Sequence, residues 1–333
     1  MQEMLNQIAI EEGLSGVLRV DVAGRPMFEG AIGLKHRGLE AANTIDTQFG
    51  LASGAKGFTA LTVMSMVERG ELSLKTTARS VLGADLPLID DRVTVAQLLT
   101  HRSGIGDYLD EDNFDDANAY VMKVPVHQLA TTEQYVAALD GYPMKHQPGE
   151  EFAYCNGSFV VLALIAERVS RVPFHDLVDQ RVCGPAGLRD TAFLRSDELP
   201  GRAATGYLEN EGLRSNVLHL PVRGSGDGGI YSTVADVHAL WDALFAGRIV
   251  SRETLAEMVF PRSTTTDMDA RYGLGFWLDA TTDAVSLHGF DAGVGFVSMR
   301  DPAGRFAYTV ISNKGQGAWP VSQRVNALLT ASA

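Results

Sequence analysis

A serine and a lysine lie three residues apart in Ser53-Gly54-Ala55-Lys56, at the start of a segment whose apolar residues recur at helical spacing. Positions i and i+3 share one helix face, so the hydroxyl and the amine are expected within reach of each other. A serine hydroxyl becomes a nucleophile when a base takes its proton, and a lysine can be that base when its pKa is lowered. An N-capping serine with a solvated lysine would show the same pattern, because Ser-x-x-Lys also arises by chance.

A second group is Tyr154-Cys155-Asn156, which follows Gln147-Pro148-Gly149-Glu150 and precedes an apolar helical segment. A tyrosine near a deprotonating lysine can share the proton and pass it to a leaving group. The amide of Asn156 could hold the substrate or the lysine. Taken alone, a half-buried loop tyrosine bonded to backbone is the commoner situation.

A third group, Leu287-His288-Gly289-Phe290-Asp291, ends a predicted strand, where a backbone N–H can donate to an oxyanion. In this order the three groups resemble the family of class C β-lactamases, D-alanyl-D-alanine carboxypeptidases and related esterases. That family has Ser-x-x-Lys, then Tyr-x-Asn, then Lys-Thr-Gly or a variant such as His-x-Gly. Stretches typical of the family also surround the motifs, at 47–52, 98–105, 148–150 and 228–233.

The resemblance implies a serine hydrolase that forms an acyl-enzyme on Ser53, with Lys56 and Tyr154 moving the proton and Asn156 on the substrate side. Small esters or D-amino acid amides are the expected substrates. A β-lactamase or D,D-carboxypeptidase is the alternative within the family. An alternative of another class is a sensor that is acylated once, or a protein that only binds its ligand.

The third motif departs from the family pattern. If Gly289 aligns with the family's glycine, Leu287-His288 replaces Lys-Thr, and the N–H of Phe290 completes the oxyanion hole. If His288 aligns with the lysine, the donor moves to Asp291. We favour the first register, because a glycine lets a substrate approach the strand closely. In either register the cation that would hold a substrate carboxylate is missing, and only His288, neutral at most working pH values, could replace it.

The elements that must position these groups are predicted from periodicity and turn signals. Strands are expected at 16–22, 26–32, 285–287, 294–300 and 306–312, and helices at 2–12, 53–69, 94–101, 132–140, 157–171, 174–182, 234–245 and 319–330. The sequence therefore predicts an α+β fold, with an antiparallel sheet built from both chain ends, flanking helices and an inserted helical lobe. Residues 1–52 and about 225–333 would form the sheet lobe and about 53–224 the helical lobe, with the active site in the cleft between them.

Composition excludes several partners. The 333 residues include 41 acidic and 28 basic ones, and this net charge of −13 disfavours nucleic acid. Two cysteines, Cys155 and Cys183, are too few for a disulfide framework and are not spaced as metal ligands, so no metal or cofactor is expected. No apolar run approaches the roughly 20 residues of a membrane span, and the N-terminus has no signal pattern. Unless the chain has been trimmed, we expect a soluble cytoplasmic protein with a small-molecule substrate.

Two weaker signals have simpler interpretations. Residues 224–229 formally satisfy G-x-G-x-x-G, but the chain lacks the strand–helix alternation of a dinucleotide-binding fold. A glycine-rich loop bordering the active site is favoured there. His101 has no partner histidine at metal-ligand spacing, so a hydrogen bond that stabilises its loop is the favoured role.

Overall fold

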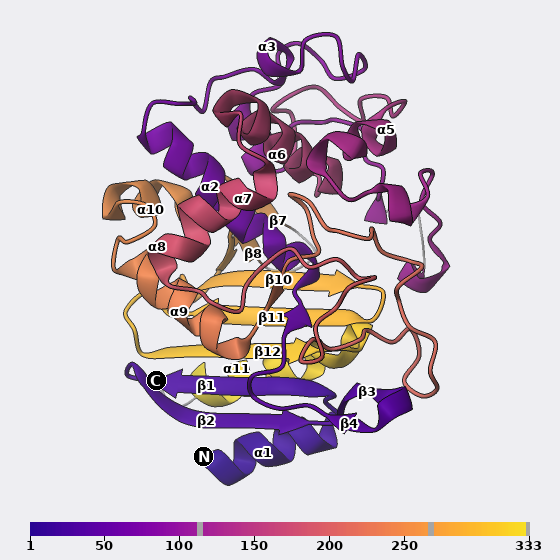
Figure 1. Ribbon diagram of the computed structural model, residues 1–333. Coiled ribbons are helices and arrows are strands. Elements are labelled where there is room, and N and C mark those ends of the chain that lie inside the picture. Colours follow the sequence, from indigo (N-terminus) through magenta and orange to yellow (C-terminus); the bar gives the residue numbers. More distant parts are fainter. Residues whose placement is uncertain (112–115, 266–269, 331–333) are drawn as a thin grey trace.

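The computed structural model describes residues 1–111, 116–265 and 270–330, and an eight-stranded antiparallel sheet organises them (Figure 1). In spatial order the strands are β2 (Arg25–Ile32), β1 (Gly16–Val22), β12 (Phe306–Ser312), β11 (Val294–Arg300), β10 (Val285–Asp291), β9 (Trp277–Asp279), β8 (Ala270–Tyr272) and β7 (Ser263–Thr265). Because β1 pairs with β12, the sheet joins the two ends of the chain. The predicted fold class is confirmed, while the two lobe boundaries stay a prediction.

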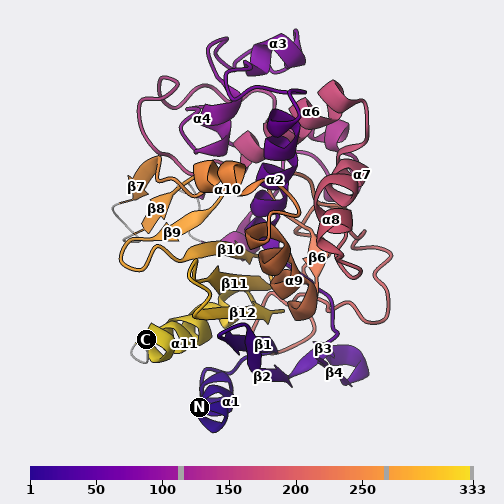
Figure 2. The same cartoon turned by 90° about the vertical axis from the view of Figure 1, so that its left-hand side faces the viewer.

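Helices cover both faces of the sheet (Figures 1 and 2). α1 (Gln2–Glu11) and α11 (Trp319–Thr330) lie on one face, and α9 (Val234–Phe245) lies on the other. The remaining helices are α2 (Ala55–Glu68), α3 (Ala78–Leu82), α4 (Val95–Leu99), α5 (Val136–Leu139), α6 (Asn156–Ser170), α7 (Phe174–Val178), α8 (Gly184–Ala186) and α10 (Arg252–Met258). Two small ladders complete the fold, β3 (Leu34–His36) with β4 (Ala41–Ala42) and β5 (Phe49–Gly50) with β6 (Tyr231–Ser232). None of the described helices has the length and apolar character needed to cross a membrane.

Helix α2 runs from the β10 region of the sheet into the group formed by α3, α4 and α6 (Figure 2). It is buried on nearly every side, from Ala55 to Met66. A helix that is apolar all round belongs in the interior of a protein. This central position carries Lys56 at the start of α2 into the interior, beside the sheet.

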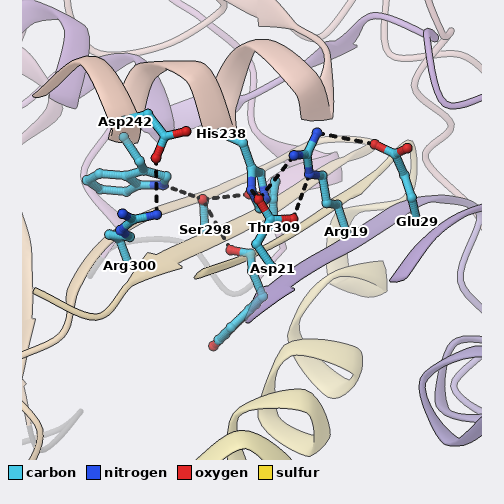
Figure 3. Close-up of polar contacts among 10 residues, drawn as sticks. Arg19, Asp21, Glu29, His238, Asp242, Ser298, Arg300 and Thr309 are labelled. Carbon is cyan, nitrogen blue, oxygen red and sulfur yellow. Dashed lines mark hydrogen bonds and ion pairs between the residues drawn. The ribbon is translucent and has the colours of Figure 1, made fainter. Parts of the chain in front are cut away.

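Side chains alternate between the two faces of β1, as expected for a strand. Leu18 and Val20 belong to the core beneath α1 and α11. Arg19 and Asp21 instead meet α9, where His238 lies within 2.9 Å of Asp21 (Figure 3). A carboxylate can only accept, so Nδ1 of His238 carries the proton. Arg19 makes two further hydrogen bonds to Asp21, at 2.9 and 3.0 Å.

This network sets a pH dependence for stability. Burial alone would raise the pKa of Asp21, but the hydrogen bonds from His238 and Arg19 outweigh it and hold the pKa well below its usual range. A carboxyl whose folded-state pKa is depressed contributes stability above its unfolded pKa, near 3.9, and loses it as the pH falls below that value.

We therefore expect Asp21→Asn to lower the free energy of unfolding by about 2 kcal/mol at pH 7, the scale of a hydrogen bond to a charged group. The difference from wild type should shrink at pH 3.5, and urea unfolding at both pH values measures it. Glu29→Gln is the matched control, because Glu29 meets Arg19 at 3.4 Å on the exposed rim of the network. An unchanged gap at the two pH values would contradict this account.

Candidate active site

Ser53 lies in a short 3-10 turn, η2 (Ala52–Gly54), that leads directly into α2. Ala52 has a φ of 44°, a left-handed conformation that costs a non-glycine residue on the order of 1–3 kcal/mol. Two backbone hydrogen bonds of 2.8 Å hold the turn, from Leu51 N to Ile230 O and from Gly54 N to Leu51 O. The turn leaves Ser53 half-buried at a helix N-terminus.

Lys56 is only 2% exposed, and its ammonium has a partner for each N–H. Nζ lies 2.9 Å from Ser53 Oγ, 2.7 Å from Asn156 Oδ1 and 2.9 Å from the carbonyl oxygen of Asp227. Burial lowers the pKa of Lys56, and the nearby carboxylates of Asp227 and Glu111 only partly oppose this. A lysine in this setting can give up its proton and act as a base.

Tyr154 lies near both Ser53 and Lys56. The Lys56 nitrogen is 4.9 Å from the centre of its ring, and its hydroxyl hydrogen-bonds to Ser53. Burial raises the pKa of Tyr154 well above its usual value, and this hydrogen bond opposes the shift. The hydroxyl is therefore protonated at neutral pH and can pass a proton without carrying a permanent charge. Ser53, Lys56 and Tyr154, separated in sequence, form one hydrogen-bonded group.

His101 supports the segment that carries Tyr154. Its Nδ1 accepts from Cys155 N at 3.0 Å, its carbonyl accepts from Ala153 N at 2.8 Å, and its ring lies 4.4 Å from that of Tyr154. Burial, followed by the nearby charge of Lys56, lowers the pKa of His101 far below 6.5. These contacts match the loop-stabilising hydrogen bond expected from the sequence.

Asn156 begins α6 and connects several parts of the site. Besides accepting from Lys56, its amide donates to Leu109 O at 2.8 Å and to Glu111 Oε1 at 3.2 Å. Its backbone N–H donates to Asp107 at 2.5 Å, so this carboxylate caps the helix. Burial raises the pKa of Asp107 to about 6, against the pull of backbone hydrogen bonds. Sequence reasoning missed Asp107, because no motif spacing marks an acid about 50 residues before the helix it caps.

Asp227, also missed, lies in the glycine-rich loop at 224–229. Its carbonyl accepts from Lys56, and its carboxylate accepts from the hydroxyl of Tyr108 at 2.5 Å. Thr59 of α2 holds the same loop by donating to Gly226 O at 2.6 Å. Burial raises the pKa of Asp227, and the nearby Lys56 opposes this. The glycine-rich sequence at 224–229 therefore forms a loop that contacts Lys56, the candidate base.

Strand β10 contacts the serine turn at Gly289 and the start of α2 at Leu287. A Cβ on Gly289 would lie 2.0 Å from Leu51 O, so only glycine lets the strand come this close to η2. Leu287, two residues earlier and on the same face, packs against Gly57 of α2. Gly289 therefore allows β10 to pack closely against the serine turn. This placement favours the register in which Gly289 is the motif glycine.

The backbone N–H of Phe290 points away from β11. Asp279 N donates to Ala284 O at 2.9 Å, so the backbone polar groups of Ala284 point toward β9. Because these groups alternate in direction along a strand, the N–H and C=O groups of residues 286, 288 and 290 point the same way. β9 pairs with β10 at Val285 and Ser286. Phe290 lies beyond the residues of β10 that pair with β9, so its N–H has no partner among the described strands on that side and can donate to an oxyanion. The alternation thus favours Phe290 over Asp291 as the donor.

His288 lies on the opposite face of β10 from Gly289. Its ring is 5.9 Å from that of Trp277 and 5.0 Å from that of Trp319, and Nε2 lies 3.0 Å from Ser286 Oγ. Burial lowers its pKa to about 4, so the ring is neutral at working pH. These contacts do not support the expectation that His288 meets the substrate, because the strand's alternation turns it away from the serine turn.

A cavity of about 530 Å³ borders the serine turn, with Ala52, Asp227, Gly228 and Phe290 in its wall. The rest of the wall comes mainly from residues 108–111, 116–122 and 194–224. Of the described residues that line it, Lys314 is the single lysine or arginine. Two arginines that could have replaced the missing cation bind elsewhere: Arg102 donates to Gly149 O at 2.6 Å, and Arg223 donates to Phe193 O at 2.9 Å.

Comparison with known proteins finds similarity over most of the chain. The chain matches the sequence profile described as Beta-lactamase over residues 4–331. It is 31% identical over 264 residues to protein Rv1367c of Mycobacterium tuberculosis, covering 70% of this chain but only 64% of that protein's length. It is also 28% identical over 287 residues to esterase EstB of Burkholderia gladioli, covering 77% of this chain and 72% of the esterase.

A crystal structure of a penicillin-binding protein from Bacillus halodurans has the same architecture. It superposes with a TM-score of 0.91 at 33% identity, covering 97% of this chain and 99% of that one. The similarity therefore extends over the sheet, the helices and the segments that carry the candidate site.

Proposed function

The chain belongs to the Beta-lactamase family of serine hydrolases, and we propose that it hydrolyses small esters or D-amino acid amides through an acyl-enzyme on Ser53. The observation that carries this proposal is the 2.9 Å contact between Ser53 Oγ and the buried nitrogen of Lys56. A solvated lysine beside a capping serine would not be 2% exposed, and its pKa would not be lowered by burial.

Acylation follows from the contacts of Lys56. When Lys56 is neutral, the Ser53 hydroxyl donates to its nitrogen across the same 2.9 Å contact. The proton then moves to Lys56 as Oγ forms a bond to the substrate carbonyl carbon, and the carbonyl oxygen becomes an oxyanion. Asn156 Oδ1 and Asp227 O accept from the ammonium that results. The N–H groups of Ser53 and Phe290 donate to the oxyanion.

Tyr154 completes the proton path. As the tetrahedral intermediate collapses, its carbon–leaving-group bond breaks, and the hydroxyl of Tyr154 gives its proton to the departing oxygen or nitrogen while Lys56 re-protonates the tyrosine. Deacylation uses the same groups in reverse, with water as the nucleophile and Ser53 as the leaving group. The product acid and the free serine result.

The test is hydrolysis of a panel of 4-nitrophenyl esters and D-amino acid amides, followed over many turnovers. Continued turnover supports a hydrolase. A burst of one equivalent per chain with no further release would instead indicate a protein that is acylated once, the alternative class considered above.

The missing cation predicts discrimination against anionic substrates. A charge-assisted hydrogen bond to a substrate carboxylate contributes about 1.5–3 kcal/mol, or roughly 10- to 150-fold in kcat/KM. We expect kcat/KM for a chromogenic cephalosporin to be lower than for a neutral ester by at least this factor at pH 8. The deficit should persist at pH 6, because the pKa of His288 near 4 leaves this side chain uncharged. Efficient cephalosporin hydrolysis at pH 8, or recovery at pH 6 that His288→Ala abolishes, would contradict this prediction.

A further inference from the structure

The cavity beside Ser53 is lined by aromatic rings from three parts of the chain. Six aromatic residues contribute to its wall: Tyr108, Tyr120, Tyr135, Tyr207, Tyr231 and Phe290. They come from the stretch before α6, from β6 and the segment that precedes it, and from the end of β10. Rings gathered around one space bind either apolar groups or cations, since the face of a ring carries partial negative charge.

The hydroxyl groups of four of these tyrosines already have protein partners. Tyr108 donates to Asp227 at 2.5 Å, Tyr135 donates to Arg223 O at 2.7 Å, and Tyr120 donates to Tyr108 O. The hydroxyl of Tyr207 accepts from a backbone N–H at 2.7 Å. Tyr108, Tyr135 and Tyr207 are buried, so the rings that a ligand in the cavity can meet are those of Tyr120, Tyr231 and Phe290. Tyr207 already binds one cation in this way, with the guanidinium of Arg37 at 4.2 Å from its ring centre.

Carboxylates also line the cavity, and they favour a cationic ligand group over an apolar one. Those lining it are Glu111, Asp116, Glu209, Asp227 and Asp291. Against these five, the described lining holds one ammonium, that of Lys314, whose nitrogen donates to Gly13 O at 3.2 Å. An anion entering this space meets a negative field, and a cation is attracted to it.

Two of these carboxylates adjoin residues of the candidate active site. Glu111 accepts from Asn156, which in turn accepts from Lys56, and Asp291 directly follows Phe290. Burial, and then the charges of Asp227 and Glu111, raise the pKa of Asp291 to about 7. The negative groups therefore lie within one another's field, which the charge of Lys56 partly offsets, and a further positive group among them would relieve more of the repulsion.

From the rings and the carboxylates together, we infer that the substrate carries a cationic group, an ammonium or a quaternary ammonium, which occupies this cavity while its ester or amide carbonyl lies at Ser53. The inference rests on the proposed function, because it names the substrate class of the same site. Rings alone would accept a neutral acyl chain equally well, and carboxylates alone would be satisfied by water and salt. Aromatic faces with acidic side chains around one space are the chemistry that recognises ammonium groups.

Two pairs of substrates of matched shape test this inference on the wild-type protein. The first pair places the charge on the acyl group: the 4-nitrophenyl esters of 4-(trimethylammonio)butanoate and of 5,5-dimethylhexanoate. The second places it on the leaving group: butanoylcholine and 3,3-dimethylbutyl butanoate. In at least one pair we expect kcat/KM, corrected for spontaneous hydrolysis, to be about tenfold higher for the cationic member. This advantage should shrink as NaCl rises from about 20 mM to about 500 mM.

A variant assigns the effect to the cavity. Glu111→Gln keeps an acceptor for Asn156 but removes the charge, so the cationic-to-neutral ratio of kcat/KM should fall at least about threefold. Glu253→Gln, the same change on the exposed surface of α10, should leave the ratio unchanged. Neutral members hydrolysed as fast as cationic ones in both pairs would overturn the inference and leave the hydrolase intact. No turnover of any ester and no adduct on Ser53 would overturn the proposed function and the inference with it.

Discussion

Replacing Ser53 with alanine is expected to lower kcat/KM for a neutral activated ester by about 10⁴-fold or more. The variant loses the oxygen that bonds to the acyl group. No other hydrogen-bond partner of Lys56 among the described residues can form that ester, because the other two are an amide oxygen and a backbone carbonyl. The oxyanion donors remain, so a small residual rate above that in buffer is expected. Stopped assays at high enzyme concentration measure it.

The control for this loss is a serine with a similar sequence context. Ser73 lies two residues before Lys75 in an exposed turn, and its hydroxyl accepts from the backbone of that lysine at 3.2 Å. Ser73→Ala should retain wild-type activity. Both variants should melt cooperatively near the wild-type temperature, because neither change opens a cavity in the core. Near wild-type activity in Ser53→Ala would remove the serine from the mechanism.

Replacing Lys56 is expected to be nearly as damaging as replacing Ser53. Lys56→Met is the sharper variant, because methionine fills the buried volume of the lysine stem but cannot accept a proton. We expect kcat/KM to fall by about 10³-fold or more. Lys75→Met, at an exposed position, is the matched control and should have no such effect.

The double variant separates cooperation from independent roles. Residues that act as one unit lose their combined effect when either is removed, so Ser53→Ala with Lys56→Met should be little worse than Ser53→Ala alone. A double variant whose loss equals the product of the two single losses would show that the serine and the lysine act separately. In that case the 2.9 Å contact between them would have no catalytic meaning.

The parts of the site that could be predicted from the sequence are those fixed by local spacing or by a motif. Ser53 and Lys56 share a helix face, and this local relation holds however the rest of the chain folds. Tyr154 and Asn156 were identified by family resemblance, and the structure brings them to Lys56. The long strands and helices were likewise predicted, because each carries several periods of its pattern.

The remaining parts depend on contacts between distant segments. Asp107 caps α6 from a loop some 50 residues earlier, and Asp227 meets Lys56 from a loop 171 residues later. Strands β7 to β9 have three residues each, too few to show an alternating pattern. The orientation of His288 depended on which face of β10 meets α2, and that became visible only with the strand's register.

The central claim is a covalent ester on Ser53, and mass spectrometry of the protein during turnover of a slow ester tests it most directly. Acid quenching in the steady state should trap a fraction of the chains with a mass increase equal to the acyl group. Digestion should then place the acyl group on the peptide that contains Ser53, and Ser53→Ala should show no adduct. An adduct on another residue, or steady turnover with no adduct in a deacylation-limited reaction, would contradict the account.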